Sequence, residues 1–234
     1  MKKVALTLVS LMASVEPAAV WAQGAKYPPF SEYMMASDAE VALARSAAPN
    51  QVSAHATIKI LTASGYQVAA QGDSGFVCMV LRGWSAPTFT PAQSREGVYY
   101  AKLRAPICFD PIATRTLLPY QELRAKLGME GKDPDAIARE VATAYARGEL
   151  PKMEGVAFAY MWSAEQDLGP GVGAWHPHMM VYAPYDTNSM LGNNEFGGSF
   201  AFVADDAGTP FSVVVIPVHG IAAIGSKTAP LHKP

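Results

Sequence analysis

The chain has 234 residues, of which 50% are hydrophobic and 16% are charged, and its formal net charge is −2 at pH 7. This composition is typical of a well-packed globular protein and excludes a chain that is disordered over its whole length. With 18 basic against 20 acidic residues and no basic stripe, the sequence argues against nucleic acid or anionic lipid as a partner. We therefore expect a small molecule or a metal ion as the partner.

The first 22 residues have the order of a secretory signal peptide. Lys2 and Lys3 precede an apolar run over residues 4–12, and residues 20–22 offer a cleavage site to a signal peptidase. A membrane anchor would need about 20 consecutive apolar residues, and polar residues interrupt this stretch. We expect cleavage after Ala22, a periplasmic or secreted location, and no membrane contact of the mature form.

After the cleavage site, the sequence predicts one domain with two short extensions. Residues 23–36 are rich in proline and aromatic side chains without a period, which indicates an extended lead-in segment. Residues 37–221 suit a single globular domain, because about 210 mature residues can bury one substantial core. We expect residues 222–234 to form a frayed tail. The sequence does not predict the oligomeric state.

Capping residues and alternating hydrophobicity predict the elements of the N-terminal half. Ser37 and Glu40 have the spacing of a capping box, which predicts a helix over residues 37–48. Three β-patterned segments joined by short glycine-containing turns predict an antiparallel meander. These segments are residues 54–61, 66–70 and 76–84. A loop then extends through residue 98, and residues 99–103 suit a short edge strand.

Cys78 and Cys108 are the only two cysteines of the chain. An even pair in an exported protein usually forms a disulfide. This one would close a loop of about 30 residues and stabilise the fold by about 3–4 kcal/mol. The alternative is a pair of buried free thiols or a thiolate metal site. A thioredoxin-like redox role has no support, because the chain lacks a Cys-x-x-Cys motif.

Asp-Pro pairs mark helix starts in the second half of the chain. Asp110-Pro111 and Asp133-Pro134 each place an N-cap residue before a proline at the first helical position. The expected helices are residues 111–118, 119–128 and 134–147, and the expected strands are residues 155–162, 179–182, 199–204 and 211–218. Because strands do not alternate with single helices, the sequence predicts an α+β fold. Its sheet is mainly antiparallel, and the central helices pack on one face.

The stretch from residue 169 to 184 holds the candidate site, because a glycine-rich segment there runs into His176-Pro177-His178. Side chains two apart on an extended segment share a face, and neutral imidazole is the commonest protein ligand for transition metals. The pair therefore predicts a metal site, with zinc as the expected ion. Four further residues are candidates to complete the ligand set, namely His55, His219, Asp186 and Glu195.

An alternative interpretation gives the same histidines a purely structural role. In it, both imidazoles brace the glycine-rich loop by hydrogen bonds to backbone carbonyls, and the protein is a non-enzymatic binding domain with an apolar pocket. Pro177 favours this interpretation because it makes a rigid corner. If the site is catalytic instead, a metal-bound water would imply hydrolytic or lyase chemistry. The candidate general bases are then Glu165, Asp167 and Glu195.

Two short patterns do not extend to a known family. In cupins a glutamate follows the second histidine of the first motif closely, whereas the first carboxylate after His178 is Asp186. The tetrapeptide of residues 72–75 resembles the nucleophile segment of chymotrypsin-like proteases. However, His55 and Ser74 are only 19 positions apart, and that fold places most of a domain between its base and its nucleophile.

Overall fold

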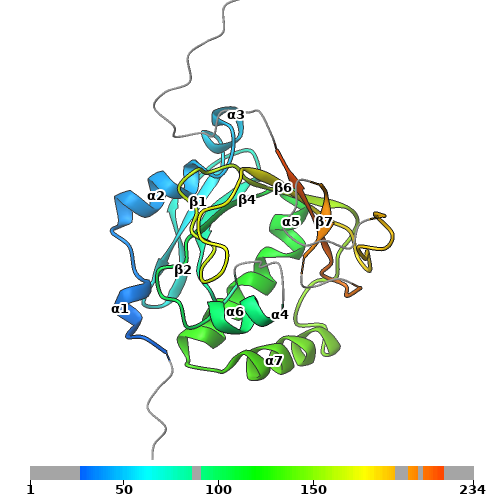
Figure 1. The fold of residues 1–234 in the computed structure, drawn as a ribbon. Coiled ribbons are helices and arrows are strands. Elements are labelled where there is room, and N and C mark those ends of the chain that lie inside the picture. Colours follow the sequence, from blue (N-terminus) through cyan, green and yellow to red (C-terminus); the bar gives the residue numbers. More distant parts are fainter. Residues whose placement is uncertain (1–26, 86–90, 193–199, 205–207, 219–234) are drawn as a thin grey trace, which may run out of the picture.

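One continuous sheet runs through the part of the chain that the computed structural model describes, which is residues 27–85, 91–192, 200–204 and 208–218 (Figure 1). Its eight strands follow the order β2-β1-β3-β4-β5-β6-β8-β7, and only β1 and β3 pair in parallel. The strands are β1 (Thr57–Thr62), β2 (Gly65–Ala70), β3 (Val77–Leu81), β4 (Ala105–Phe109), β5 (Ala157–Met161), β6 (His178–Tyr182), β7 (Phe202–Val203) and β8 (Val213–Pro217). The predicted α+β class with a mainly antiparallel sheet is confirmed.

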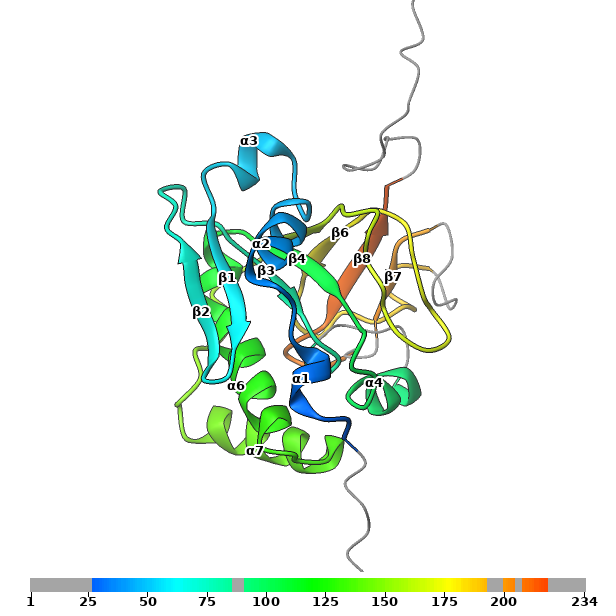
Figure 2. The ribbon, with the colours of Figure 1, turned by 90° about the vertical axis from the view of Figure 1, so that its left-hand side faces the viewer.

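Helices cover both faces of this sheet. The central helices pack on one face, as predicted, and α7 packs against α6, whereas α2 lies on the opposite face over β1, β3 and β4 (Figure 2). The helices are α1 (Phe30–Tyr33), α2 (Ser37–Arg45), α3 (Asn50–Ser53), α4 (Pro91–Gly97), α5 (Pro111–Thr116), α6 (Leu118–Met129) and α7 (Pro134–Ala146). None of the helices in these described ranges is long and apolar enough to cross a bilayer. The signal peptide predicted over residues 1–22 and the tail predicted over 222–234 lie outside the described residues.

The central helices start where their capping residues predict. The side chain of Asp110 accepts the N–H of Ala113 at 2.6 Å, and that of Asp133 accepts the N–H of Ala136 at 2.8 Å. In both cases the proline that follows the aspartate occupies the first turn, where no intrahelical donor is needed. These contacts are local, which is why sequence alone located these two helix starts.

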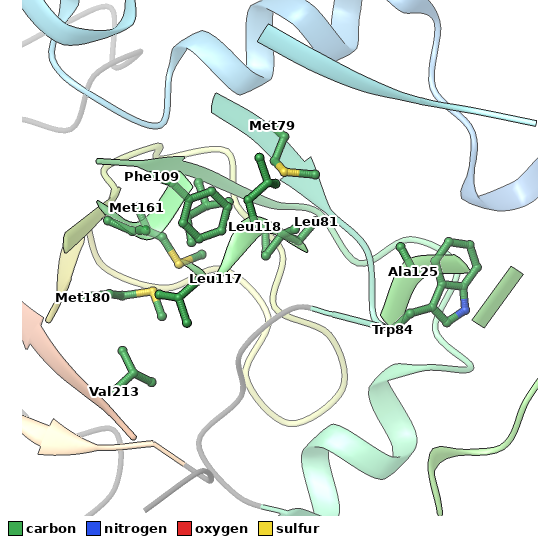
Figure 3. Packing of buried hydrophobic residues seen from close by; sticks show 14 of the residues in the cluster. Met79, Leu81, Trp84, Phe109, Leu117, Leu118, Ala125, Met161, Met180 and Val213 are labelled. Atoms are coloured by element: carbon green, nitrogen blue, oxygen red, sulfur yellow. The ribbon is translucent and has the colours of Figure 1, made fainter. Parts of the chain in front are cut away.

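The main core lies between the sheet and the helices α5 and α6 (Figure 3). Met79 and Leu81 of β3 and Phe109 of β4 pack there with Leu117 and Leu118, and all five side chains are buried. The other buried side chains that Figure 3 labels are Trp84, Ala125, Met161, Met180 and Val213. Because side chains alternate along a strand, the residues between these point to the opposite face, towards α2.

A smaller core on that opposite face contains the disulfide. Cys78 of β3 and Cys108 of β4 stand directly opposite each other in the antiparallel ladder and are bonded, as predicted. Both are fully buried, with Leu43 and Ala44 of α2 in the same core. The alternative of two free thiols or a thiolate metal site is therefore excluded.

The pairing of the first three strands differs from the predicted meander. β3 does not pair with β2 but lies parallel to β1, through Thr57 with Val77 and Ile58 with Cys78. All five residues of β3 are buried, whereas three of the six residues of β2 are exposed. A strand buried on both faces belongs in the interior of a sheet, and the half-exposed β2 therefore occupies the edge.

The region between β3 and α5 was also predicted incorrectly. Residues 98–103 form turns and not an edge strand, and the strand β4 begins only at Ala105. All of β4 is buried, so its sequence lacks the alternation that marks a half-exposed strand. It also contains Pro106, a residue that argues against a central strand. Within the predicted loop, residues 91–97 form the helix α4.

Glu40 was expected to cap the first long helix, but it serves another purpose. α2 begins at Ser37 without a side-chain cap, and Glu40 is fully buried. Its Oε2 atom lies 2.8 Å from Nη2 of the equally buried Arg82, in an ion pair without hydrogen-bond alignment. A buried carboxylate requires such a partner, and burial in this pair replaces the capping role that the local pattern predicted.

The two side chains of this ion pair also bind backbone groups of β1 and β3, whose parallel ladder consists of two residue pairs. Oε1 of Glu40 accepts the backbone N–H of Leu61 at 3.0 Å. Arg82 donates from Nε to the carbonyl of Tyr33 at 2.8 Å and from Nη1 to that of Val80 at 2.5 Å. The two side chains thus satisfy backbone groups of α1, β1 and β3, and they connect these elements to α2.

Candidate functional site

The two histidines of the predicted metal motif lie in different environments. His178 begins β6, opposite Met161 of β5 and Pro217 of β8. It shares the core-facing side of β6 with Met180, and only 2% of it is exposed. His176 precedes the strand and is exposed.

Hydrogen bonds show how the imidazole of His178 is used. Its Nδ1 atom lies 2.8 Å from the carbonyl oxygen of His176, and Nε2 of Gln166 donates to the same oxygen at 2.9 Å. Gln166 also donates to the carbonyl of Trp175 at 3.0 Å. A carbonyl oxygen can only accept. The proton of the neutral His178 ring is therefore on Nδ1, and its lone pair is on Nε2.

Burial keeps the ring of His178 uncharged, and Trp175 is one of the side chains packed against it. The Trp175 ring centroid lies 4.7 Å from that of His178 and 5.3 Å from that of His176. Phe202 of β7 meets Trp175 from another side at 5.9 Å. Burial disfavours the charged imidazole and lowers the pKa of His178 from its ordinary 6.5 to about 4. At neutral pH the ring is a neutral donor inside the core.

Residues 169–173, the Gly loop, form a turn that is closed by its own backbone. Positive φ angles occur at Gly169 (88°), Gly171 (80°) and Gly173 (62°), and residues other than glycine rarely adopt them. Gly173 donates to the carbonyl of Gly169 at 2.8 Å, and Leu168 donates to that of Gly173 at 2.9 Å. The alternation of glycines in the sequence is therefore explained by backbone geometry.

An open cleft of about 650 Å³ adjoins this turn. We call it the Gly-loop cleft, and its lining consists of Tyr100, Gln166, Asp167 and residues 169–174. Asp167 organises the wall, since Oδ1 accepts the N–H of Gly169 at 2.9 Å and Oδ2 accepts the hydroxyl of Tyr100 at 3.2 Å. Its backbone pairs with Arg104 in an isolated bridge. Of the candidate general bases, Asp167 is thus engaged in structure, and Glu165 is exposed.

The remaining predicted metal ligands are not brought to this corner within the described chain. His55 lies in the turn before β1, four strand positions from β6, which corresponds to roughly 19 Å. Its Nδ1 atom lies 3.2 Å from Oδ1 of Asp73 on the surface, and Ser74 donates its hydroxyl to the His55 carbonyl instead of the ring. His219 and Glu195 lie outside the described residues. Among the residues that the structure describes, no group of three or more His, Cys, Asp or Glu side chains could hold a metal ion.

Two residues of the cleft were missed by sequence reasoning. Tyr100 was assigned to an edge strand, and Gln166 belonged to no motif. Both come from turns far apart in the chain, and their proximity depends on the bridge between Arg104 and Asp167. No local pattern signals such a contact.

Comparisons with protein-family models, with curated proteins and with solved structures found no match for this chain.

Proposed function

We propose that this protein is an exported, non-enzymatic binding domain whose ligand site is the Gly-loop cleft. The observation that supports this most is the carbonyl of His176, which accepts hydrogen bonds from both His178 and Gln166. These bonds fix the chain just after the Gly loop, beside a cleft of about 650 Å³. A wall that is ordered before the ligand arrives reduces the entropy lost on binding.

Two independent features support export. The disulfide between Cys78 and Cys108 is of a kind that persists mainly in oxidising compartments. The order of charges and apolar residues over positions 1–22 is that of a secretory signal peptide.

The structural role of His178 can be tested with two matched amide substitutions. In His178→Asn the amide nitrogen takes the place of Nδ1, whereas in His178→Gln it reaches the position of Nε2. The proposal expects the Asn variant to be more stable than the Gln variant by about 1 kcal/mol, the value of one hydrogen bond. Urea denaturation measures this difference. Equal stabilities would remove the support that the His176 carbonyl gives to the proposal.

The location of the ligand site is tested by adding mixtures of small molecules to the labelled protein. Changes in backbone amide resonances should map to residues 166–174, because the cleft is formed there. A ligand whose resonance changes lie instead at the cavity of about 530 Å³ between α6 and the β1–β2 turn would contradict the assignment. Lack of any response at residues 166–174 would contradict it as well.

A second candidate function is metal binding at His176 and His178, and one observation favours it. The Nδ1 proton of His178 is held by a carbonyl oxygen, so Nε2 is left as the lone-pair nitrogen. Histidines that bind metals typically donate their other ring N–H in this way. In addition, Val218 donates its N–H at 2.9 Å to the carbonyl of Pro177, between the two histidines, and His219 is the next residue in sequence.

Zinc titration tests this second candidate. A bound ion would stabilise the folded protein by mass action, by about 2.7 kcal/mol at a hundredfold excess over the dissociation constant, and would therefore raise the melting temperature. Replacing both His176 and His178 by alanine should abolish that rise, and single His219→Ala and Glu195→Ala variants identify the third ligand. If the wild-type protein melts at the same temperature with zinc, copper or chelator, the metal site is rejected. The proposal of a non-enzymatic binding domain is then unaffected.

A further inference from the structure

The side-chain oxygen of Gln166, a buried residue of the Gly-loop cleft, accepts no hydrogen bond within the described chain. Gln166 is 2% exposed, and its Nε2 donates to the carbonyls of Trp175 and His176. Its Oε1 is buried and has no partner within the described chain. Leaving a buried acceptor unsatisfied costs about 1–3 kcal/mol. A ligand that brings a donor to this oxygen gains that energy.

Asp167 and Tyr100 add further acceptors at the wall of the same cleft. Each carboxylate oxygen of Asp167 already accepts one bond, from Gly169 or from Tyr100, and has room for a second. The hydroxyl of Tyr100 donates its one hydrogen bond to Asp167, and its oxygen can still accept a hydrogen bond from a ligand. Burial, followed by the charge of Asp167, raises the pKa of Tyr100, which keeps this phenol neutral. The lining is thus rich in acceptors, in fixed positions.

The charges around the cleft argue against a strongly charged ligand. Within the described lining, Asp167 is the one charged residue, so an anion would be repelled. Arg104 lies beside Asp167, with backbone hydrogen bonds of 2.8 and 2.9 Å between them, and partly balances its charge. The charge of Asp167 therefore does not require a cationic ligand, and neutral hydroxyl groups can supply the hydrogen bonds that its carboxylate accepts.

The rest of the lining offers small and apolar surface to the body of a ligand. Pro170 and Val172 alternate with the glycines, and the ring of Tyr100 packs against Gly169, within 3.4 Å of the place that a Cβ would occupy. C–H groups can pack on such surface while hydroxyls meet Gln166 and Asp167. An open cleft with apolar walls and a few fixed polar groups is the usual form of a small-molecule site.

We propose that the Gly-loop cleft binds a neutral, hydroxyl-rich ligand of the saccharide class. This inference rests on the proposed binding function and adds the chemistry of the ligand. Hydroxyls supply donors to Gln166 Oε1 and to the carboxylate of Asp167, and the C–H faces of the sugar ring pack against Tyr100 and Val172.

Calorimetric titration of the mature protein with a panel of neutral and charged compounds tests the proposal. The panel contains neutral oligomers of glucose, xylose and N-acetylglucosamine, an anionic uronic-acid oligomer, and spermidine as a polyamine. We expect at least one neutral oligomer to bind at one site per chain, more tightly than the anionic oligomer and the polyamine. Asp167→Asn should weaken that binding about 10-fold or more, because hydrogen bonds to a charged group are lost.

Tyr100→Phe and Lys126→Ala complete the design. Tyr100→Phe keeps the ring and removes one acceptor, so it should weaken binding even if Asp167→Asn does not fold. Lys126 lines the other cavity, and Lys126→Ala should leave the affinity unchanged. If only the anionic oligomer or spermidine binds, and Asp167→Asn alters that binding, the assignment to a neutral saccharide is overturned while the cleft remains the site. If no compound binds, or if both cleft variants leave the affinity unchanged, the inference is overturned together with the cleft.

Discussion

His178 is held as a neutral donor in the core, and this makes the stability of the protein depend on pH. Burial lowers its pKa to about 4, whereas in the unfolded chain it returns to about 6.5. Between these values the unfolded state binds a proton that the folded state does not, so acidification favours unfolding. The stabilising contribution is complete above about pH 6.5 and is lost as the pH falls towards 4.

The expected loss over that window is about 3 kcal/mol, from a pKa difference of about 2.5. Urea denaturation at pH 7 and pH 4.5 measures it, and His178→Asn provides the control because it cannot titrate there. The wild type should lose clearly more stability than the variant between the two pH values. Parallel pH profiles of the two proteins would show that His178 is solvated and not buried.

Glu40 and Arg82 form a buried ion pair on which the stability of the fold also depends. Glu40→Gln keeps the size of the side chain but leaves Arg82, which is fully buried, without its counter-charge. Breaking a buried pair in this way costs about 3–5 kcal/mol. Glu154→Gln removes one partner of the exposed pair with Arg115 and should have little effect on urea denaturation. Similar midpoints for the two variants would contradict the role assigned to Glu40.

At the scale of elements, the packing of α6 against Trp84 leaves no room for a side chain at Gly128. A Cβ there would lie 2.2 Å from Cγ of Trp84, and the ring of Tyr33, stacked on that of Trp84 at 4.3 Å, limits the movement of Trp84. Gly128→Ala should therefore cost about 1–3 kcal/mol through overpacking, although alanine favours helices. Gly155→Ala, where nothing lies within 4 Å, is the control. A Gly128→Ala variant as stable as this control in thermal melts would refute the close contact.

Sequence predicted those elements whose signals are local and missed those decided by distant contacts. Asp110 and Asp133 cap the helices that follow them, because a cap involves atoms only three residues apart. The same local rule failed at Glu40, because its partner Arg82 follows three intervening strands in the chain. The pairing of β3 with β1 could not be read from turn lengths, since it depends on which strand is buried on both faces.

The site was predicted only in part for the same reason. His176 and His178 stood out because they are close in sequence, and the structure places one of them in the core and the other outside. Gln166 and Tyr100 are brought together by the β-bridge between Arg104 and Asp167. No sequence motif predicts this bridge. The proposed metal depends on His219 or Glu195, which lie outside the described residues.

For the whole molecule, one measurement of intact mass reports both the cleavage of the signal peptide and the formation of the disulfide. If residues 1–22 are a signal peptide, exported protein begins at or within a few residues of Gln23. Its intact mass should also be lower by two hydrogens than that of the reduced chain, because Cys78 and Cys108 are bonded. Full-length protein recovered from the cytoplasm would count against export.

Imidazole NMR of His178 in the labelled wild-type protein, with and without zinc, distinguishes a structural donor from a metal ligand. We expect a neutral ring protonated on Nδ1 at pH 7, with a lone pair on Nε2, because Nδ1 donates to the carbonyl of His176. We also expect that zinc leaves both nitrogen signals in place. A zinc-dependent displacement of the Nε2 signal, or a ring protonated on Nε2, would show that His178 does not brace the Gly loop as a structural donor alone.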